Sequence, residues 1–275
     1  MRRYGVLNQV SGSLDAQIVN YNLGFSISLT PDFSVGVTAT LAELARRMLI
    51  FGMHVHIGIE DPELRIDVMN QSRYFVPHLL ALSASSPLWH GRDTGLKSYR
   101  TVIFESLPRT GIPPILKSWA DYDGFLDTLI GTGCIDEPTK IWWDVRPHPK
   151  FPTLEFRVCD IATKVDEAVC LAAVIQAIVA KLIKLRSKNQ SWRYYRHHLI
   201  TENKWRAVRY GVHGRLIDFG KRETGMTHDR AARPATCTVQ APHTPIPHPY
   251  LVPVSCRTSA RVLTSSISRV IRSQR

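Results

Sequence analysis

A run of alternating polar and apolar positions between residues 48 and 59 is the clearest strand pattern in the chain. Successive side chains of a strand point to opposite faces of its sheet. The run therefore places His54 and His56 on one face and the apolar side chains between them on the other. Gly52 and Gly58 flank the pair, and glycine lets a backbone or a ligand approach closely. The pattern predicts a strand with a polar face that can meet a ligand.

A second alternating run spans residues 153–160 and predicts another strand. It puts Glu155 and Arg157 on one face and apolar side chains on the other. Residues 140–146 predict a strand shortly before it, and the connection at 147–149 is rich in proline. Two strands joined in this way are expected to pair antiparallel.

Apolar positions three and four residues apart predict helices in other parts of the chain. These helices are expected at residues 41–48, 64–82, 118–130, 165–185 and 202–211. Pro77 should kink or divide the second of them. The fourth is apolar over most of its surface and is expected to be buried, with Thr163 or Asp166 as its N-cap. A last strand is expected at 216–219, so the predicted fold class is α+β, an antiparallel sheet backed by helices.

Composition divides the chain into three parts. Residues 1–40 are rich in Ser, Gly and Thr, with short strands conceivable at 17–19 and 25–29, and we expect a weakly ordered lead-in. Residues 41–220 hold most of the predicted elements and a polar loop at 83–100, and they form the expected domain. Residues 221–275 contain many prolines and arginines without an apolar period, so we expect a disordered tail.

Charge and composition limit the classes of function. The 275 residues are 44% hydrophobic and 21% charged, as in ordinary globular proteins. No long uncharged apolar run or signal-peptide core is present, and the five cysteines are scattered, so we expect a cytoplasmic protein without a membrane partner. The net charge of +12 favours acidic partners, but about half of the excess lies after residue 221. We therefore expect no specific nucleic-acid binding.

The predicted polar face combines His54, His56, Glu155 and Arg157. Glutamate together with histidine can hold Mg²⁺ or Mn²⁺, and arginine suits a phosphate group. Metal and arginine together neutralise the charge that builds up during phosphoryl transfer. The residues therefore favour nucleotide-dependent chemistry, although an isolated His-x-His pair is more often only the polar face of a sheet.

Six sequence motifs occur in one order over about residues 42–220. They are Phe51–Gly58, Ser72–His78, Leu82–Pro87, Asp93–Arg100, Trp143–Pro147 and Glu155–Asp160. Each is weak alone, but the ordered set closely resembles the small bacterial carboxylate–amine ligases of the glutamate–cysteine ligase type 2 family. These look like relatives of glutamine synthetase.

The resemblance implies a glutamine synthetase-like fold and an ATP-dependent ligase. ATP would phosphorylate the γ-carboxylate of glutamate, and an amine, cysteine in the named activity, would attack the acyl phosphate in a step of glutathione biosynthesis. The implied cofactors are ATP and Mg²⁺ or Mn²⁺, and the implied partners are glutamate and cysteine or another amine. Family members are often homo-oligomers.

The resemblance also assigns roles to residues. His54 would contact the metal or a nucleotide phosphate, and Glu155 would bind the divalent ion. Arg157 would stabilise the moving phosphoryl group. The further catalytic candidates are Arg100 and Arg146, and the further candidates for nucleotide or substrate contacts are His56, Arg73 and Ser98. Asn203 and Arg206 match a downstream family segment to which we assign no role.

The chain also departs from the family pattern. Family members carry a Gly-x-Glu-x-Glu strand before the histidine strand, and the glutamates of that strand are metal ligands, but no such motif precedes His54. The family's C-terminal helices are replaced after Gly220 by the tail. We therefore expect a chain truncated at its start, with little or no ligase activity.

Two other interpretations stay open at this point. One is a metal-dependent amidohydrolase, a class that also opens with His-x-His on a strand but needs a repeated βα pattern and later histidines. The other is an inactive fragment or a non-enzymatic basic binding protein.

Overall fold

The computed structural model describes residues 7–10, 13–16, 25–31, 50–219 and 223–226, with side-chain detail for 50–219. The helix expected at 41–48, the strand expected at 17–19 and most of the tail expected to be disordered lie outside these residues. Within them the chain mixes helices with antiparallel sheet, which confirms the α+β class.

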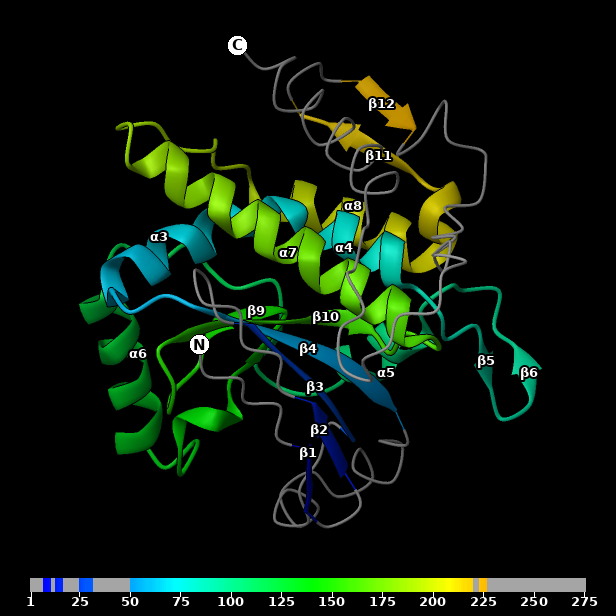
Figure 1. The fold of residues 1–275 in the computed structure, drawn as a ribbon, viewed down its shortest axis with the longest axis horizontal. Coiled ribbons are helices and arrows are strands. Elements are labelled where there is room, and N and C mark those ends of the chain that lie inside the picture. The colour runs from blue at the N-terminus through cyan, green and yellow to red at the C-terminus, as the bar shows by residue number, and fades with distance from the viewer. Residues whose placement is uncertain (1–6, 11–12, 17–24, 32–49, 220–222, 227–275) are drawn as a thin grey trace, which may run out of the picture.

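A six-stranded sheet organises the fold, in the order β1-β2-β3-β4-β10-β9 (Figure 1). All five neighbouring pairs are antiparallel. The strands are β1 (Leu7–Val10), β2 (Ser13–Ala16), β3 (Phe25–Pro31), β4 (Phe51–Gly58), β9 (Val145–Pro147) and β10 (Thr153–Asp160). The described strands lack the repeated parallel βα units that an amidohydrolase requires, so that interpretation is wrong for this part of the chain.

The apolar face of the sheet lies under a layer of helices. Met53, Val55 and Ile57 of β4 are fully buried, together with Leu154 and Phe156 of β10. Helices α3 (Pro62–Ser72), α4 (Val76–Ser83) and α7 (Val165–Arg186) pack on this face (Figure 1). Full burial of an aliphatic or aromatic side chain contributes about 1.5–3 kcal/mol, so this interface holds the two layers together.

Pro77 divides the helix predicted at 64–82. Helix α3 ends at Ser72, a 3₁₀ turn spans Arg73–Phe75, and α4 starts at Val76 with Pro77 in its first turn. Proline is tolerated there because the backbone N–H groups of a first turn have no partner within the helix.

Helix α7 confirms the long helix predicted at 165–185. Its N-cap residue is Lys164 and no side chain caps it, so the expected capping by Thr163 or Asp166 is wrong. Asp166 and Glu167 instead lie in its first turn, where negative charge favours the helix dipole. By length and composition α7 could cross a membrane, but Ala172 and other residues on one side of it belong to the core.

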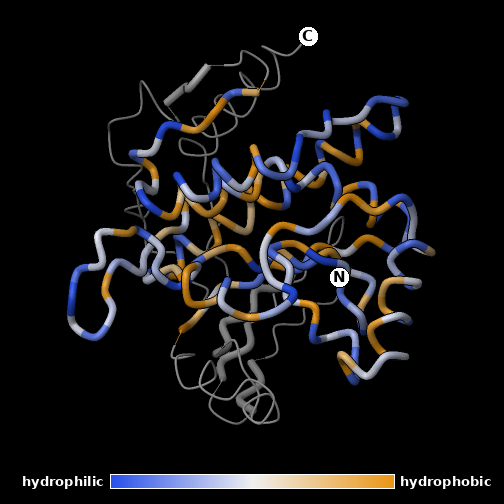
Figure 2. The backbone as a smooth tube through the Cα atoms, turned by 180° about the vertical axis from the view of Figure 1, so that it is seen from behind, coloured by the Kyte–Doolittle hydropathy of each residue, from blue (hydrophilic) through white to orange (hydrophobic). Residues whose placement is uncertain are grey.

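The remaining elements lie around the sheet and its helical layer. They are α5 (Tyr99–Glu105), α6 (Trp119–Gly131), α8 (His197–Tyr210), β11 (Arg215–Asp218) and β12 (Glu223–Met226). Helix α8 begins at His197 rather than at residue 202, and it ends at Tyr210, followed by Gly211 as its C-cap with a φ of +56°. In the polar loop, β5 (Leu88–Trp89) and β6 (Arg92–Asp93) form a largely hydrophilic hairpin that projects from the body (Figure 2).

The strand predicted at 140–146 is divided. A 3₁₀ turn at Pro138–Lys140 comes first. Then β8 (Trp142–Trp143) pairs in parallel with β7 (Thr110–Gly111), whereas β9 pairs antiparallel with β10. Different partners on the two sides of Asp144 therefore break one predicted strand into two.

Candidate active site

The polar face of β4 and β10 brings His54, His56, Glu155 and Arg157 together, as predicted. Glu155 is paired with His56 in the register of the two strands. His54, Glu155 and Arg157 are buried, and His56 is partly exposed. We call these four residues, with Arg146 of β9, the polar floor.

A β-bulge in β10 shapes the floor. Phe156 is paired with Val55 and Cys159 with Met53, so Arg157 and Val158 together oppose one residue of β4. A bulge shifts all later residues to the other face. Beyond it, Cys159 lies opposite Met53 of the apolar face, and Asp160 lies opposite Gly52. Strict alternation would have placed the thiol with Glu155 and the carboxylate in the core.

Glu155 is the centre of the floor. Its Oε1 accepts a hydrogen bond from Arg157 Nη1 (2.7 Å), and its Oε2 accepts one from Arg146 Nε (2.8 Å). His54 Nδ1 and His56 Nε2 lie 3.4 Å and 3.8 Å from Oε1. Burial alone would raise the pKa of Glu155, but the charges of Arg157 and Arg146 outweigh it and hold this pKa well below its usual range.

Both arginines of the floor are also held by other groups. Arg146 Nη1 donates to the carbonyl oxygens of Thr139 (2.7 Å) and Ile141. Arg157 Nη1 lies 3.4 Å from His54 Nδ1, and its guanidinium lies over the Phe104 ring, 5.8 Å from the centroid. The floor therefore presents two fixed guanidinium groups around one carboxylate.

His148 is a neighbour of the floor that sequence reasoning did not select. Its ring meets the His56 ring edge-on, with centroids 5.3 Å apart, and stacks on Phe151 at 4.9 Å. Its Nδ1 accepts hydrogen bonds from the backbone N–H groups of Lys150 (3.2 Å) and Phe151 (3.1 Å). Burial lowers the pKa of His148 to about 4. Its position between two prolines, in the turn that joins two strands, was the available sequence signal.

The free energy of unfolding is expected to fall as the pH drops from about 6.5 towards 4, and His148→Asn should reduce that fall. The folded-state pKa of His148 is depressed from 6.5 to about 4, so below pH 6.5 the unfolded chain binds the proton first. Urea denaturation at several pH values measures the effect. His213→Asn, at an exposed position, is the control and should keep the wild-type slope. An unchanged slope in His148→Asn would contradict the prediction.

Asp160 fixes the polar loop to the end of β10. Its carboxylate accepts hydrogen bonds from Ser86 Oγ (2.7 Å), Ser98 Oγ (2.8 Å) and the backbone N–H of Ser85 (3.0 Å). Ser98, a predicted nucleotide or substrate contact, is fully buried in this arrangement. In the structure Ser98 therefore helps to fix the polar loop to β10, next to the floor.

Arg100 and Arg73, two further predicted site residues, lie in different places. Arg100 reaches the polar face, where its guanidinium donates to backbone carbonyl oxygens of the bulge. Arg73 lies in the helical layer, where its Nε donates to Pro113 O (2.8 Å) and its Nη2 lies 3.4 Å from His197 Nδ1. The structure does not bring Arg73 to the floor.

A buried lysine on α8 was also missed. Lys204 Nζ lies 2.5 Å from Asp144 Oδ2 and 2.7 Å from Glu105 Oε1. Burial would lower the pKa of Lys204, but the two carboxylates outweigh it and raise this pKa. Asn203 beside it binds the backbone of Ile217, and Arg206 pairs with Glu202. In this structure Asn203 holds β11 to α8, and Arg206 pairs within the helix.

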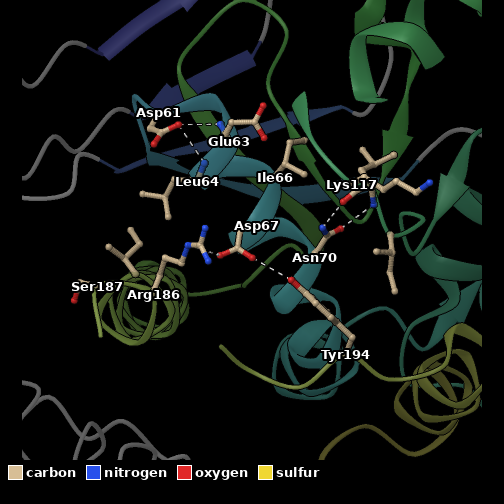
Figure 3. A pocket seen from close by; sticks show the side chains of 13 residues that line it. Asp61, Glu63, Leu64, Ile66, Asp67, Asn70, Lys117, Arg186, Ser187 and Tyr194 are labelled. Carbon is tan, nitrogen blue, oxygen red and sulfur yellow. Dashed lines mark hydrogen bonds and ion pairs between the residues drawn. The ribbon is translucent and has the colours of Figure 1, made fainter. Parts of the chain in front are cut away.

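A cleft of about 660 Å³ lies away from the floor, between α3, the end of α7 and residues 115–117 (Figure 3). None of the predicted site residues lines it. Its polar groups bind one another: Asp67 accepts from Tyr194 Oη (3.0 Å), and Asn70 exchanges hydrogen bonds with the backbone of Leu116. We therefore place the candidate active site at the floor.

A divalent metal was expected at His54 and Glu155. Across the described residues, no three His, Cys, Asp or Glu side chains gather where they could hold a metal ion. Both Glu155 oxygens already accept hydrogen bonds from guanidinium groups. On β3, the residues paired with His54 and His56 are Ser28 and Ser26, neither of which carries a carboxylate. Mg²⁺ and Mn²⁺ prefer several oxygen ligands, so the described residues alone do not fit either ion.

Comparison with known proteins gives a consistent result. The model of the family described as Glutamate-cysteine ligase family 2 (GCS2) matches residues 38–242. Three bacterial relatives share the name "Putative glutamate--cysteine ligase 2". The chain is 56% identical over 197 residues to the one from Herpetosiphon aurantiacus, covering 72% of this chain and 51% of the relative. It is 54% identical over 185 residues to that of Solibacter usitatus (67% and 48% covered). It is 57% identical over 187 residues to that of Roseiflexus castenholzii (68% and 49% covered). The chain thus spans about half the length of these relatives.

Proposed function

Because this chain belongs to glutamate–cysteine ligase family 2, we propose that its polar floor is part of the site of an ATP-dependent carboxylate–amine ligase. The observation that carries the proposal is the buried Arg146–Glu155–Arg157 cluster, set beside His54 on one face of the sheet. Two guanidinium groups around one carboxylate leave an excess of positive charge, which favours a phosphate or carboxylate ligand.

The proposed reaction joins glutamate to an amine. An oxygen of the glutamate γ-carboxylate attacks the γ-phosphorus of ATP, which forms an acyl phosphate and releases ADP. The amine nitrogen then attacks the acyl carbon, phosphate leaves, and the nitrogen loses a proton. Phosphorylation is needed because a carboxylate is a poor electrophile without a leaving group.

Arg157 and Arg146 have the main proposed roles. Their guanidinium groups would stabilise negative charge on the transferred phosphoryl group, and Glu155 would hold them in place before ATP binds. His54 would contact a nucleotide phosphate, and His56 would line the substrate side. Mg²⁺ would neutralise phosphate charge, but the described residues alone do not form a site for this ion. We therefore propose that Mg²⁺ arrives bound to ATP.

The same premise supports further proposals about the whole protein. Residues 41–220 would form a catalytic domain with a glutamine synthetase-like sheet, active on small molecules in the cytoplasm as a homo-oligomer, in glutathione biosynthesis. Serine residues at the β3 positions paired with His54 and His56 supply no carboxylate charge. We therefore expect a rate of ADP release well below that of the Herpetosiphon aurantiacus relative assayed in parallel.

Nucleotide binding tests the proposal most directly. Mg-ATP is expected to raise the thermal unfolding midpoint of the chain, because a ligand that binds only the folded state stabilises it. Arg157→Gln should lose most of this shift. Arg206→Gln changes a cation that pairs within α8, and it should keep the shift. A wild-type midpoint that does not respond to Mg-ATP would contradict the proposal.

Product formation separates a ligase from a hydrolase. ADP release is expected only when glutamate and an amine are both present, and a panel of amines that includes cysteine would identify the preferred one. ADP release at the same rate without glutamate would count against a ligase.

A further inference from the structure

The bulge in β10 decides which residues at the end of this strand lie on the same face as the polar floor. It brings Asp160 to the face that already carries Glu155 and Arg157, and it keeps Cys159 in the core. A bulge leaves backbone groups without partners in the strand ladder, and buried unpaired groups are costly. Its stability therefore depends on groups outside the sheet.

Two such groups satisfy the bulge. The backbone N–H of Arg157 donates to Asp144 O (2.8 Å). On the carbonyl side, the Arg100 guanidinium donates from Nη2 to Arg157 O (3.3 Å) and from Nη1 to Val158 O (3.5 Å). Arg100 thus binds both carbonyl groups of the two bulged residues.

Gly52 leaves the space in which this guanidinium lies. A Cβ atom at this position would lie 2.7 Å from Arg100 Cζ and 2.8 Å from Arg100 Nε, well inside van der Waals contact. Arg100 is buried, so its side chain would have to leave the carbonyl groups to make room. An alanine at position 52 should therefore act on the bulge by displacing Arg100.

Helix α5 and the polar loop hold Arg100 in this position. Its guanidinium lies over the Phe104 ring at 5.3 Å, and the Arg157 guanidinium lies over the same ring. Its backbone N–H donates to Ser86 Oγ (3.1 Å), and Ser86 in turn binds Asp160. The bulge thus positions Asp160, and Asp160 anchors the polar loop. The loop in turn holds Arg100 next to the bulge.

We infer that Arg100 is a positioning residue: its guanidinium clamps the β10 bulge and thereby fixes the backbone of Arg157 beside the floor. Gly52 leaves the space that this guanidinium requires. Arg100 therefore acts through Arg157 rather than as a catalytic residue. The clamp is independent of the chemistry, and only its effect on nucleotide binding rests on the proposed function.

The rate of thiol labelling at Cys159 reports whether the bulge is intact. Cys159 is fully buried, and loss of the bulge would turn it towards the polar face. In Arg100→Met and in Gly52→Ala, native-state labelling of Cys159, followed by mass spectrometry of its peptide, is expected to become about tenfold faster or more, as local opening becomes easier. Ile178→Ala, a core variant on α7, controls for general destabilisation, and Gly124→Ala, where a Cβ meets open space, controls for loss of a glycine.

Non-additivity is the second readout. Gly52→Ala should have little further effect once Arg100 is already methionine, because the guanidinium hydrogen bonds that it disrupts are already absent. Arg100→Met and Gly52→Ala should each weaken binding of Mg-ATP, and the double variant should match Arg100→Met alone.

Cys159 labelling at the wild-type rate in Arg100→Met and Gly52→Ala, or labelling that rises equally in Ile178→Ala, would overturn the clamp. Additive effects of the two substitutions would overturn it as well. A wild-type chain that does not bind Mg-ATP would contradict the proposed function instead, and the labelling and additivity results would still decide the clamp.

Discussion

Replacing Glu155 by alanine is expected to lower the free energy of unfolding by about 3–5 kcal/mol, because removal of one partner from a buried ion pair leaves an uncompensated charge. Glu155 is only 2% exposed, and its two oxygens bind Arg146 and Arg157. Both guanidinium groups would stay buried without the carboxylate that neutralises them. Urea denaturation at pH 7 measures the loss.

The control and the pH dependence make the Glu155 prediction specific. Asp136→Ala removes the carboxylate of an exposed residue, which pairs with Lys140, and should change stability little. Because the folded-state pKa of Glu155 is depressed, its contribution is present above the unfolded pKa of about 4.5 and is lost as the pH falls further. Below pH 4.5 the free energy of unfolding of Glu155→Ala should therefore fall less steeply than that of the wild type. A stability close to wild type at pH 7 would show that the two arginines do not need the carboxylate.

Much of the floor could be predicted from sequence because its signals are local. A period of two puts His54 with His56 and Glu155 with Arg157, and the structure confirms both strands. The helix at 165–185 was equally clear, since its apolar positions alone identify it. In both cases one element carries the whole pattern.

The parts that could not be predicted depend on distant segments. The bulge in β10 is stabilised by Arg100 and by the backbone of Asp144, which no local period reports. Arg73 lies in one of the six motifs, yet it belongs to the helical layer, where it contacts Pro113 and His197 instead of the floor. A motif records which residues occur together in the chain, but only packing decides which of them meet.

Lys204 and Asp144 form a buried contact for which the sequence carries no local signal. Nothing in the basic helical pattern of α8 distinguishes Lys204 from the exposed cations near it, yet it is only 3% exposed. Its two partners come from α5 and from the break between β8 and β9. The ion pair therefore joins three segments that are separate in sequence.

Lys204→Met is expected to lower the free energy of unfolding by about 3–5 kcal/mol, as for other buried pairs that lose one partner. Methionine fills a similar volume, so the main effect is the charge of Asp144, which is buried and would lose its cation. Urea denaturation of the single variant gives the magnitude. Lys117→Met, a lysine at the exposed surface, is the matched control and should change stability little.

A second substitution separates lost charge from lost packing. If the uncompensated carboxylate causes the loss, adding Asp144→Asn to Lys204→Met should recover part of it, and the two effects should be clearly less than additive. The backbone of Asp144 also accepts the Arg157 N–H of the bulge. Lys204→Met should therefore also reduce the upward shift of the midpoint with Mg-ATP, whereas Lys117→Met should not. Additive effects in the double variant would show that Lys204 stabilises the fold through its packing and not through its charge.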